Sequence, residues 1–225
     1  MSYTVIIPSK SAANLDRCVN ALCEKQPGLS IIVVDDGIEW EEVRGGFISC
    51  SDFKVIDGEK PFVFARNCNL AIKACNGDDD VILLNDDALL ETARGFDLLD
   101  HISRTHAEFG LISAVTNIAG NPAQRPKQSG LRVEKRTVAF VCAYIPRRTI
   151  HAIGLLDERF TEYGWEDNDY CLRVRKAGMK IGVFDDCFVD HATLRSSFRG
   201  EPESFRNIEA GRKIYIEKWG AQAWA

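Results

Sequence analysis

Two short acidic stretches are the parts of the chain best suited to chemistry. Residues 85–87 read Asn-Asp-Asp after an apolar run, and residues 165–169 read Trp-Glu-Asp-Asn-Asp before a helical pattern. Carboxylates held close together repel one another and raise each other's pKa. A chain that builds such clusters commonly neutralises them with a bound cation or uses one carboxylate as a proton acceptor. The two stretches therefore predict an enzyme that acts on a phosphorylated, metal-bridged substrate.

Alternating strand and helix patterns must position these stretches. Continuous apolar runs predict buried strands, and apolar residues spaced i, i+3, i+4 and i+7 predict helices. Strands are expected at residues 4–8, 30–34, 54–56, 81–84, 111–115, 138–145, 181–184 and 188–190, and helices around 15–22, 64–75, 93–106, from about 147, 165–177 and 202–219. This alternation predicts an α/β fold with a mainly parallel central sheet and helices on both faces.

Composition fits a single globular domain. The 225 residues are 45% hydrophobic and 27% charged, with a net charge of −5. This balance gives no general electrostatic reason to bind nucleic acid or anionic lipid. We recognise no signal peptide, and no apolar run approaches the roughly 20 residues of a membrane span, so a cytoplasmic location is expected. The eight cysteines form no Cys-x-x-Cys pair, which favours buried reduced thiols over a disulfide framework or a zinc site.

Carboxylates stand at the ends of two predicted strands. Asp35 and Asp36 end the second strand, and residues 85–87 end the fourth. Ligands of open parallel sheets bind beyond the carboxyl ends of the strands, so both groups should face one crevice. The first pair suits hydrogen bonds to a base or ribose, and the second suits a divalent cation such as Mg²⁺ or Mn²⁺. The alternative for either pair is a helix cap or a solvated turn.

Five motifs in this order resemble a family 2 glycosyltransferase of the GT-A fold, over about residues 3–191. They are Val5-Ile6-Ile7-Pro8, Val33-Val34-Asp35-Asp36-Gly37, Ala65-Arg66-Asn67, Leu84-Asn85-Asp86-Asp87 and Glu166-Asp167-Asn168-Asp169. Residues 215–220, Tyr-Ile-Glu-Lys-Trp-Gly, are also similar to the ending of many such enzymes. The resemblance implies one Rossmann-like GT-A domain over residues 1–225. Its nucleotide-sugar-binding half would be 1–115, and its acceptor-binding and catalytic half 116–225.

The resemblance also implies a donor site and a metal site. A nucleotide-diphospho-sugar is the implied donor, with UDP as the expected nucleotide and Mn²⁺ or Mg²⁺ as the cation. Asp87 and His191 would bind the metal, although a lone histidine is often structural. The donor would be contacted by Pro8, Ser9, Asp35, Asp36, Arg66, Asn85, Asp86, Trp165, Arg195 and Arg199. Asn85 departs from the family pattern, which has Asp there. Surface exposure for the arginines and core packing for Trp165 are the alternatives.

Asp167 would be the catalytic base of an inverting transfer. A carboxylate must accept the proton of the acceptor hydroxyl as that hydroxyl attacks the anomeric carbon. Glu166 and Asp169 compete for this role, and a cap for the helix is the structural alternative. Rival functions are a sugar nucleotidylyltransferase and a non-catalytic nucleotide-sugar-binding module. The turn at residues 9–14 lacks the glycine-rich loop of the first, and both carboxylate sites argue against the second.

The segment 116–136 breaks the strand and helix pattern. It is rich in Asn, Pro, Gln, Gly and basic residues, and loops this long tend to be functional or mobile. A carbohydrate or glycoconjugate, as in polysaccharide biosynthesis, is the acceptor class that the resemblance implies. The basic strip could instead hold an anionic acceptor such as lipid phosphate or DNA, or be an ordinary solvated loop. It comprises Arg125, Lys127, Arg132, Lys135 and Arg136. The oligomeric state is left open.

Overall fold

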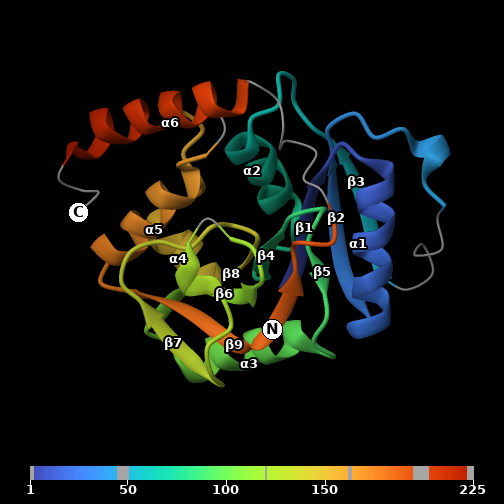
Figure 1. The fold of residues 1–225 in the computed structure, drawn as a ribbon, viewed down its shortest axis with the longest axis horizontal. Helices are drawn as coiled ribbons and strands as arrows, with labels where there is room; N and C mark the ends of the chain where they lie inside the picture. The colour runs from blue at the N-terminus through green and yellow to red at the C-terminus, as the bar shows by residue number, and fades with distance from the viewer. Residues whose placement is uncertain (1–2, 45–50, 120, 162–163, 195–202, 222–225) are drawn as a thin grey trace.

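A mixed nine-stranded sheet forms the centre of the molecule (Figure 1). The computed structural model describes the chain except residues 1–2, 45–50, 120, 162–163, 195–202 and 222–225. The strand order is β3-β2-β1-β4-β8-β6-β9-β5, with β7 paired to β9. The strands are β1 Tyr3–Ser9, β2 Leu29–Asp35, β3 Ser51–Asp57, β4 Asp80–Leu84, β5 Leu89–Leu90, β6 Phe109–Thr116, β7 Leu131–Glu134, β8 Cys142–Ile145 and β9 Lys180–Asp190.

Parallel pairing dominates the sheet. The strands β3, β2, β1 and β4 are parallel to one another, and β6 is parallel to β9. The strand β8 is antiparallel to both β4 and β6, so it joins the two parallel parts and keeps β6 in the direction of β4. The carboxyl ends of β1, β2, β4 and β9 therefore reach the same edge of the sheet.

Helices cover both faces. They are α1 Ala12–Lys25, α2 Phe64–Ala74, α3 Gly95–Thr105, α4 Arg147–Ile153, α5 Glu166–Lys176 and α6 Glu203–Trp219. One core cluster packs α1 and α3 against the sheet, and another packs α2, α4 and α5 against the opposite face. None of the helices within the described residues is long and apolar enough to cross a membrane. The α/β fold with helices on both faces is confirmed.

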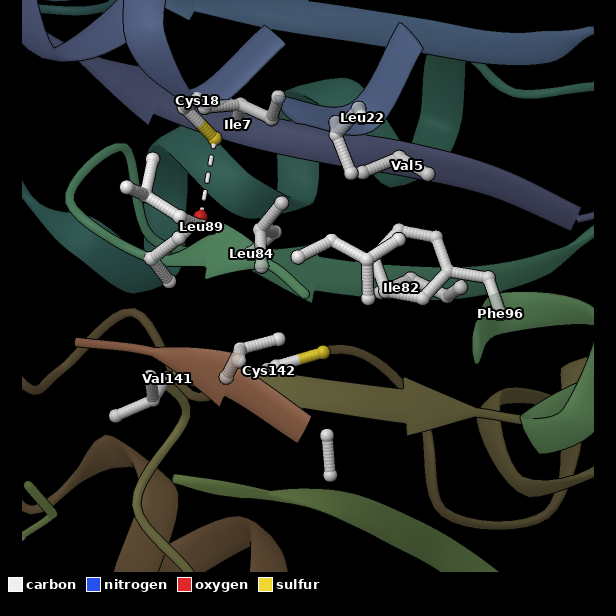
Figure 2. Packing of buried hydrophobic residues seen from close by; sticks show 14 of the residues in the cluster. Val5, Ile7, Cys18, Leu22, Ile82, Leu84, Leu89, Phe96, Val141 and Cys142 are labelled. Carbon is white, nitrogen blue, oxygen red and sulfur yellow. Dashed lines mark hydrogen bonds between the residues drawn. The ribbon is translucent and has the colours of Figure 1, made fainter. Parts of the chain in front are cut away.

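Alternating side chains of the buried strands supply the two cores. Val5 and Ile7 of β1 lie with Cys18 and Leu22 of α1 in the first cluster, while Ile6 lies in the second (Figure 2). Successive side chains of a strand point to opposite faces, so a strand covered on both faces must be apolar throughout. This is why the continuous apolar runs predicted β1, β2 and β4 correctly.

The remaining differences lie in short or half-exposed elements. The segment 116–136 contains a one-turn helix at Pro122–Gln124 and the strand β7, which the sequence did not predict. The strand β8 begins only at Cys142, and β9 continues through Asp190. Six cysteines are free, as predicted, but Cys23 is disulfide-bonded, which corrects the expectation of reduced thiols throughout. The free cysteines are Cys18, Cys68, Cys75, Cys142, Cys171 and Cys187.

Gly58 allows a close approach at the carboxyl end of β2. Its N–H donates to the Asp35 carbonyl at 2.8 Å, and a Cβ at this position would lie 2.7 Å from that oxygen. We expect Gly58→Ala to lower the free energy of unfolding by about 1–3 kcal/mol, because backbone must move to relieve the clash. Gly77→Ala is the matched control, since nothing lies within 4 Å of its added Cβ. Urea unfolding of both variants is the measurement, and equal stabilities would contradict the prediction.

Candidate active site

The first acidic stretch lies in a tight turn at the carboxyl end of β4. Asp86 and Asp87 are buried, and the Ala88 N–H donates to the Asn85 carbonyl at 3.1 Å to close the turn. The Ser9 hydroxyl at the end of β1 donates to Oδ2 of Asp86 at 2.7 Å. Burial raises the pKa of Asp86 to about 6, although the Ser9 hydrogen bond opposes that rise, and the charge of Asp87 adds to it. Ser9 and Asp86, predicted as neighbours of the donor, therefore contact one another.

Asp87 faces His191 across the end of the sheet. The distance from Nε2 of His191 to Oδ1 of Asp87 is 3.0 Å, and Nδ1 lies 2.7 Å from the Ile118 carbonyl. A carbonyl oxygen only accepts, so Nδ1 carries a proton and Nε2 is directed at the carboxylate. A neutral ring would then present a lone pair to a negative oxygen. A proton or a cation at Nε2 removes that repulsion.

These two side chains have the chemistry of a metal-binding pair. Imidazole nitrogen and carboxylate oxygen both bind divalent transition metals, and a carbonyl acceptor on the other ring nitrogen fixes the tautomer. Within the described part of the chain, no group of three His, Cys, Asp or Glu side chains gathers to hold a metal ion. Asp87 and His191 therefore fit a cation whose other ligands come from outside this pair.

The second acidic stretch begins the helix α5. Oδ1 of Asp167 accepts from the N–H and the side-chain amide of Asn168 at 2.7 and 3.0 Å. Burial raises the pKa of Asp167 to about 6, while hydrogen bonds from Asn168 and the Phe140 N–H oppose the rise. Burial and the adjacent Asp167 raise the pKa of Glu166 to about 8. Oε2 of Glu166 is buried without a hydrogen-bond partner in the described structure. Glu166 and Asp167 thus differ in how well their charge is solvated.

A turn with left-handed backbone conformation precedes these carboxylates and sets their orientation. Gly164 has φ of 89°, and Trp165, which precedes the helix, has φ of 79°. This region is unfavourable for a bulky residue by on the order of 1–3 kcal/mol, so surrounding contacts must hold it. The Trp165 ring is buried, and its centroid lies 5.2 Å from that of Tyr215. Core packing of Trp165 is thus observed, and its predicted contact with the donor stays a prediction.

One dipeptide links the two acidic stretches. The Asn85 N–H donates to the Val141 carbonyl at 3.0 Å, and the preceding residue, Phe140, directs its N–H at Asp167. Adjacent residues joined by a trans peptide lie about 3.8 Å apart at Cα, so the two contacts must be close neighbours. The β4 turn and the start of α5 are therefore held beside each other, although about eighty residues separate them in sequence.

Asp169 has a different environment from its neighbours. Its side chain is fully buried, and Oδ2 lies 2.8 Å from Nε of Arg173. Oδ1 lies 2.6 Å from Nζ of Lys218 and accepts from Nε1 of Trp219 at 2.7 Å. Both carboxylate oxygens are thus occupied by donors of the protein. These contacts favour a structural role for Asp169, which the sequence analysis named as a competing candidate for the catalytic base.

Asp35 and Asp36 are both bound by the protein. Oδ1 of Asp35 accepts from the N–H groups of Gly37 and Ile38 at 2.7 Å, and Oδ2 accepts from Trp40 Nε1 at 2.6 Å. Burial opposes ionisation of Asp35, but these hydrogen bonds prevail and lower its pKa. Asp36 forms an ion pair with Lys60. Asp35 therefore stabilises the turn after β2. This is the structural alternative that the sequence also offered for the pair.

The other predicted donor residues lie around the same edge. The Asp36 N–H donates to the Ser9 carbonyl at 2.8 Å, which joins the ends of β1 and β2, and Pro8 is buried in β1. Nε of Arg66 pairs with Glu59 at 3.1 Å. Arg195 and Arg199 lie outside the described residues, so their predicted roles stay untested.

Several partners of the site were not predicted. Lys60, Ile118, Phe140 and Lys218 contact site residues from loops and from α6. The similarity of residues 215–220 to the ending of related enzymes was the only signal for Lys218, and it gave no partner. Nothing in the local sequence marks a backbone group such as the Ile118 carbonyl.

Comparison with known proteins shows the family of the chain. The model of glycosyl transferase family 2 matches residues 4–152. No curated protein sequence matches the chain. GalNAc-T7 crystallised with UDP, GalNAc and Mn²⁺ aligns with a TM-score of 0.72 and 15% identity, over 99% of this chain and 49% of that one.

Two structures of S. aureus TarS, residues 1–349, are also similar. One aligns with a TM-score of 0.66 and 18% identity, over 96% of this chain and 65% of that one. The other, in complex with UDP-GlcNAc, aligns with 0.65 and 14% identity, over 99% and 69%. The chain thus spans less than two thirds of GalNAc-T7 and of the first TarS structure. At these identities the likeness is one of fold.

The raised pKa of Glu166 predicts how stability depends on pH. The pKa of Glu166 is about 8 in the folded state and 4.5 ordinarily, so the folded state holds this proton more tightly than the unfolded state does. The contribution of Glu166 to the free energy of unfolding is therefore complete below pH 4.5 and is lost as pH rises toward 8. Glu166→Gln cannot ionise, so we expect the variant to gain stability relative to wild type over this interval. The gain is about 1.4 kcal/mol for each unit by which the folded pKa exceeds the unfolded one.

Guanidinium unfolding at pH 5 and pH 8.5 measures this gain. Glu217→Gln, on the exposed surface of α6, is the matched control. We expect its stability difference from wild type to be the same at both pH values. A Glu166→Gln difference that stays constant or shrinks with pH would contradict the predicted protonation.

Proposed function

Because the chain belongs to glycosyl transferase family 2, we propose that it transfers a sugar from a nucleotide-diphosphate donor to an acceptor hydroxyl with inversion. The observation that carries this proposal is the Phe140-Val141 link, which holds Asp167 beside the turn of Asp86 and Asp87. A metal-binding pair and a carboxylate of raised pKa at one sheet edge are the groups that such a transfer requires.

Asp167 is the proposed general base. Its pKa of about 6 leaves it ionised at neutral pH and still basic enough to accept a proton from an attacking hydroxyl. The two donors from Asn168 occupy Oδ1, which fixes the carboxylate and directs Oδ2 as the proton acceptor. Glu166, with a pKa of about 8, is protonated at neutral pH and so spares Asp167 a second adjacent charge. Asp169 is the structural member of the stretch.

Asp87 and His191 are the proposed ligands of a divalent cation. Such a cation supplies positive charge for the departing diphosphate when it is bound there. Ser9 holds Asp86 at the same turn, where Asp86 can accept from a ribose or sugar hydroxyl. UDP is the proposed nucleotide, supported by the UDP, UDP-GlcNAc and Mn²⁺ in the similar crystal structures. Asp36 and Arg66 are the proposed contacts to the nucleoside.

A carbohydrate hydroxyl is the proposed acceptor. Arg132 of the basic strip is committed to Asp185 and to the carbonyls of Ala123 and Arg125. It therefore anchors the loop and is removed from the set of cations that could meet an anionic acceptor. The other cations of the strip are exposed, and the carbohydrate acceptor is proposed from the family match.

The donor site predicts nucleotide binding that depends on a cation. Wild-type protein should melt at a higher temperature with UDP and Mn²⁺ together than with either alone. A ligand present at a hundred times its dissociation constant stabilises the folded state by about 2.7 kcal/mol. In a protein of this size each kcal/mol raises the melting temperature by roughly 2–4 °C. Asp87→Asn should abolish the combined shift, whereas Asp78→Asn, in the exposed turn before β4, should retain it. Thermal melts over UDP, GDP, dTDP and CDP measure this, and no shift with any nucleotide would instead favour a non-catalytic module.

The base predicts a loss of turnover and a pH limit. Asp167→Asn cannot accept a proton, so we expect kcat to fall by about 10²- to 10⁴-fold with little change in donor binding. Wild-type activity should decline as pH falls through about 6, because Asp167 is then protonated. Release of UDP from a UDP-sugar, followed from pH 5 to 9, is the measurement. An active Asp167→Asn enzyme would remove Asp167 from the mechanism.

A further inference from the structure

The helix α6 contacts two other elements through Lys218, whose side chain is largely shielded from water. Nζ of Lys218 lies 2.6 Å from Oδ1 of Asp169 in α5 and 2.5 Å from Oδ2 of Asp157, in the loop after α4. Both partners are largely shielded from water, with side chains 0% and 14% exposed. Opposite charges interact strongly where water is excluded, and loss of one partner leaves the others unpaired. Lys218 thus fixes the start of α5 to α6 and to the loop after α4.

The same helix presses on the turn that precedes Glu166. A Cβ added to Gly211 would lie 2.7 Å from the Gly164 carbonyl and 3.1 Å from Cδ1 of Trp165. Tyr215, one turn further along α6, packs on the Trp165 ring. Both residues of the turn are left-handed, and a bulky residue keeps that conformation only where its surroundings hold it. Gly211 and Tyr215 supply those surroundings.

Together these contacts fix the start of α5 on both sides of Asp167. The Asp169 N–H donates to the Trp165 carbonyl at 2.9 Å, so the turn and the Lys218 anchor are joined within one helical turn. Asp167 lies between the two fixed points. None of the α6 residues with these contacts reaches the carboxylate that we assign as the base.

We propose that α6 is the positioning element of the transferase site, and that Lys218 and Gly211 act as positioning residues for the Asp167 carboxylate. The inference rests on the proposed function of Asp167. A shift of about 1 Å in a reacting group can lower a rate by about a hundredfold, so a helix that only sets backbone position can govern turnover. The family match ends at residue 152, and α5 and α6 lie beyond it.

The test removes the anchor without removing volume. Lys218→Met keeps the stem but loses the charge, and Lys218→Arg keeps the charge. The matched control is Lys213→Met, at an exposed position of the same helix. We expect Lys218→Met to lower kcat for UDP release from UDP-GlcNAc by about tenfold to a hundredfold, with KM changed less than about twofold. Lys218→Arg should recover most of that loss, and Lys213→Met should match wild type.

A second readout needs no substrate. Titration of the ¹³C-labelled Asp167 carboxyl, followed by NMR together with its neighbour Glu166, should give a higher pKa in Lys218→Met than in wild type. Loss of the Lys218 cation leaves the negative charge of Asp169 without its lysine partner two residues from Asp167, and a like charge disfavours the charged form. Variants of α6 that keep the Lys218 charge separate this effect of charge from a change in position. A Lys218→Met protein that only melts at a lower temperature, with Asp167 titration unchanged, would overturn the proposal and leave Lys218 as a purely structural residue.

Milder variants cover a failure of Lys218→Met to fold. Trp219→Phe removes one donor to Asp169 and keeps an aromatic side chain, and Gly211→Ala pushes α6 from the turn. Both should shift the Asp167 titration, and unchanged titration in both would overturn the proposal. If Asp167→Asn has full activity, the proposed function fails. If Asp167→Asn is inactive but the α6 variants behave as wild type in titration and turnover, only the positioning role fails.

Discussion

Repulsion between carboxylates that are withdrawn from water is the constraint around which this edge of the sheet is built. Bringing such groups together raises their pKa and costs free energy unless each acquires a donor, a cation or a proton. Asp86 takes a hydroxyl from Ser9, and Asp87 takes the ring of His191. Asp169 takes a lysine, an arginine and an indole N–H. Each carboxylate is thus compensated by a different kind of group.

The least compensated groups are the informative ones. Glu166 leaves one buried oxygen without a partner, and Asp167 is bound mainly through one of its oxygens. Strained or under-satisfied groups persist where the rest of the fold is stable enough to hold them. Here the left-handed Trp165 adds backbone strain at the same place. The two cores on opposite faces of the sheet and the contacts of α6 provide the stability that offsets this strain.

The features that the sequence predicted correctly are those that depend on local patterns of apolar and polar residues. Continuous apolar runs specified β1, β2 and β4, and the strand ends located the carboxylates, because parallel strands bring their carboxyl ends to one edge. The strand β5 spans only Leu89–Leu90, and β7 is four residues long and mostly half-buried, so neither gives a readable period. Arg173, four residues on in α5, is the local partner of Asp169, whereas Lys218 and Trp219 lie about fifty residues away in α6. Only tertiary packing distinguishes Asp169 from Asp167, two residues earlier.

We propose that a cation held by Asp87 and His191 lies at the same site as Asp167. Paramagnetic broadening of backbone amide signals by substoichiometric Mn²⁺ in the presence of UDP tests it most directly. We expect the amides of residues 86–87, 167 and 191 to broaden first, and those of α3, which contacts Tyr3 at the start of β1, to persist. Earliest broadening elsewhere, or broadening at residues 86–87 that leaves Asp167 unaffected, would contradict a single shared site.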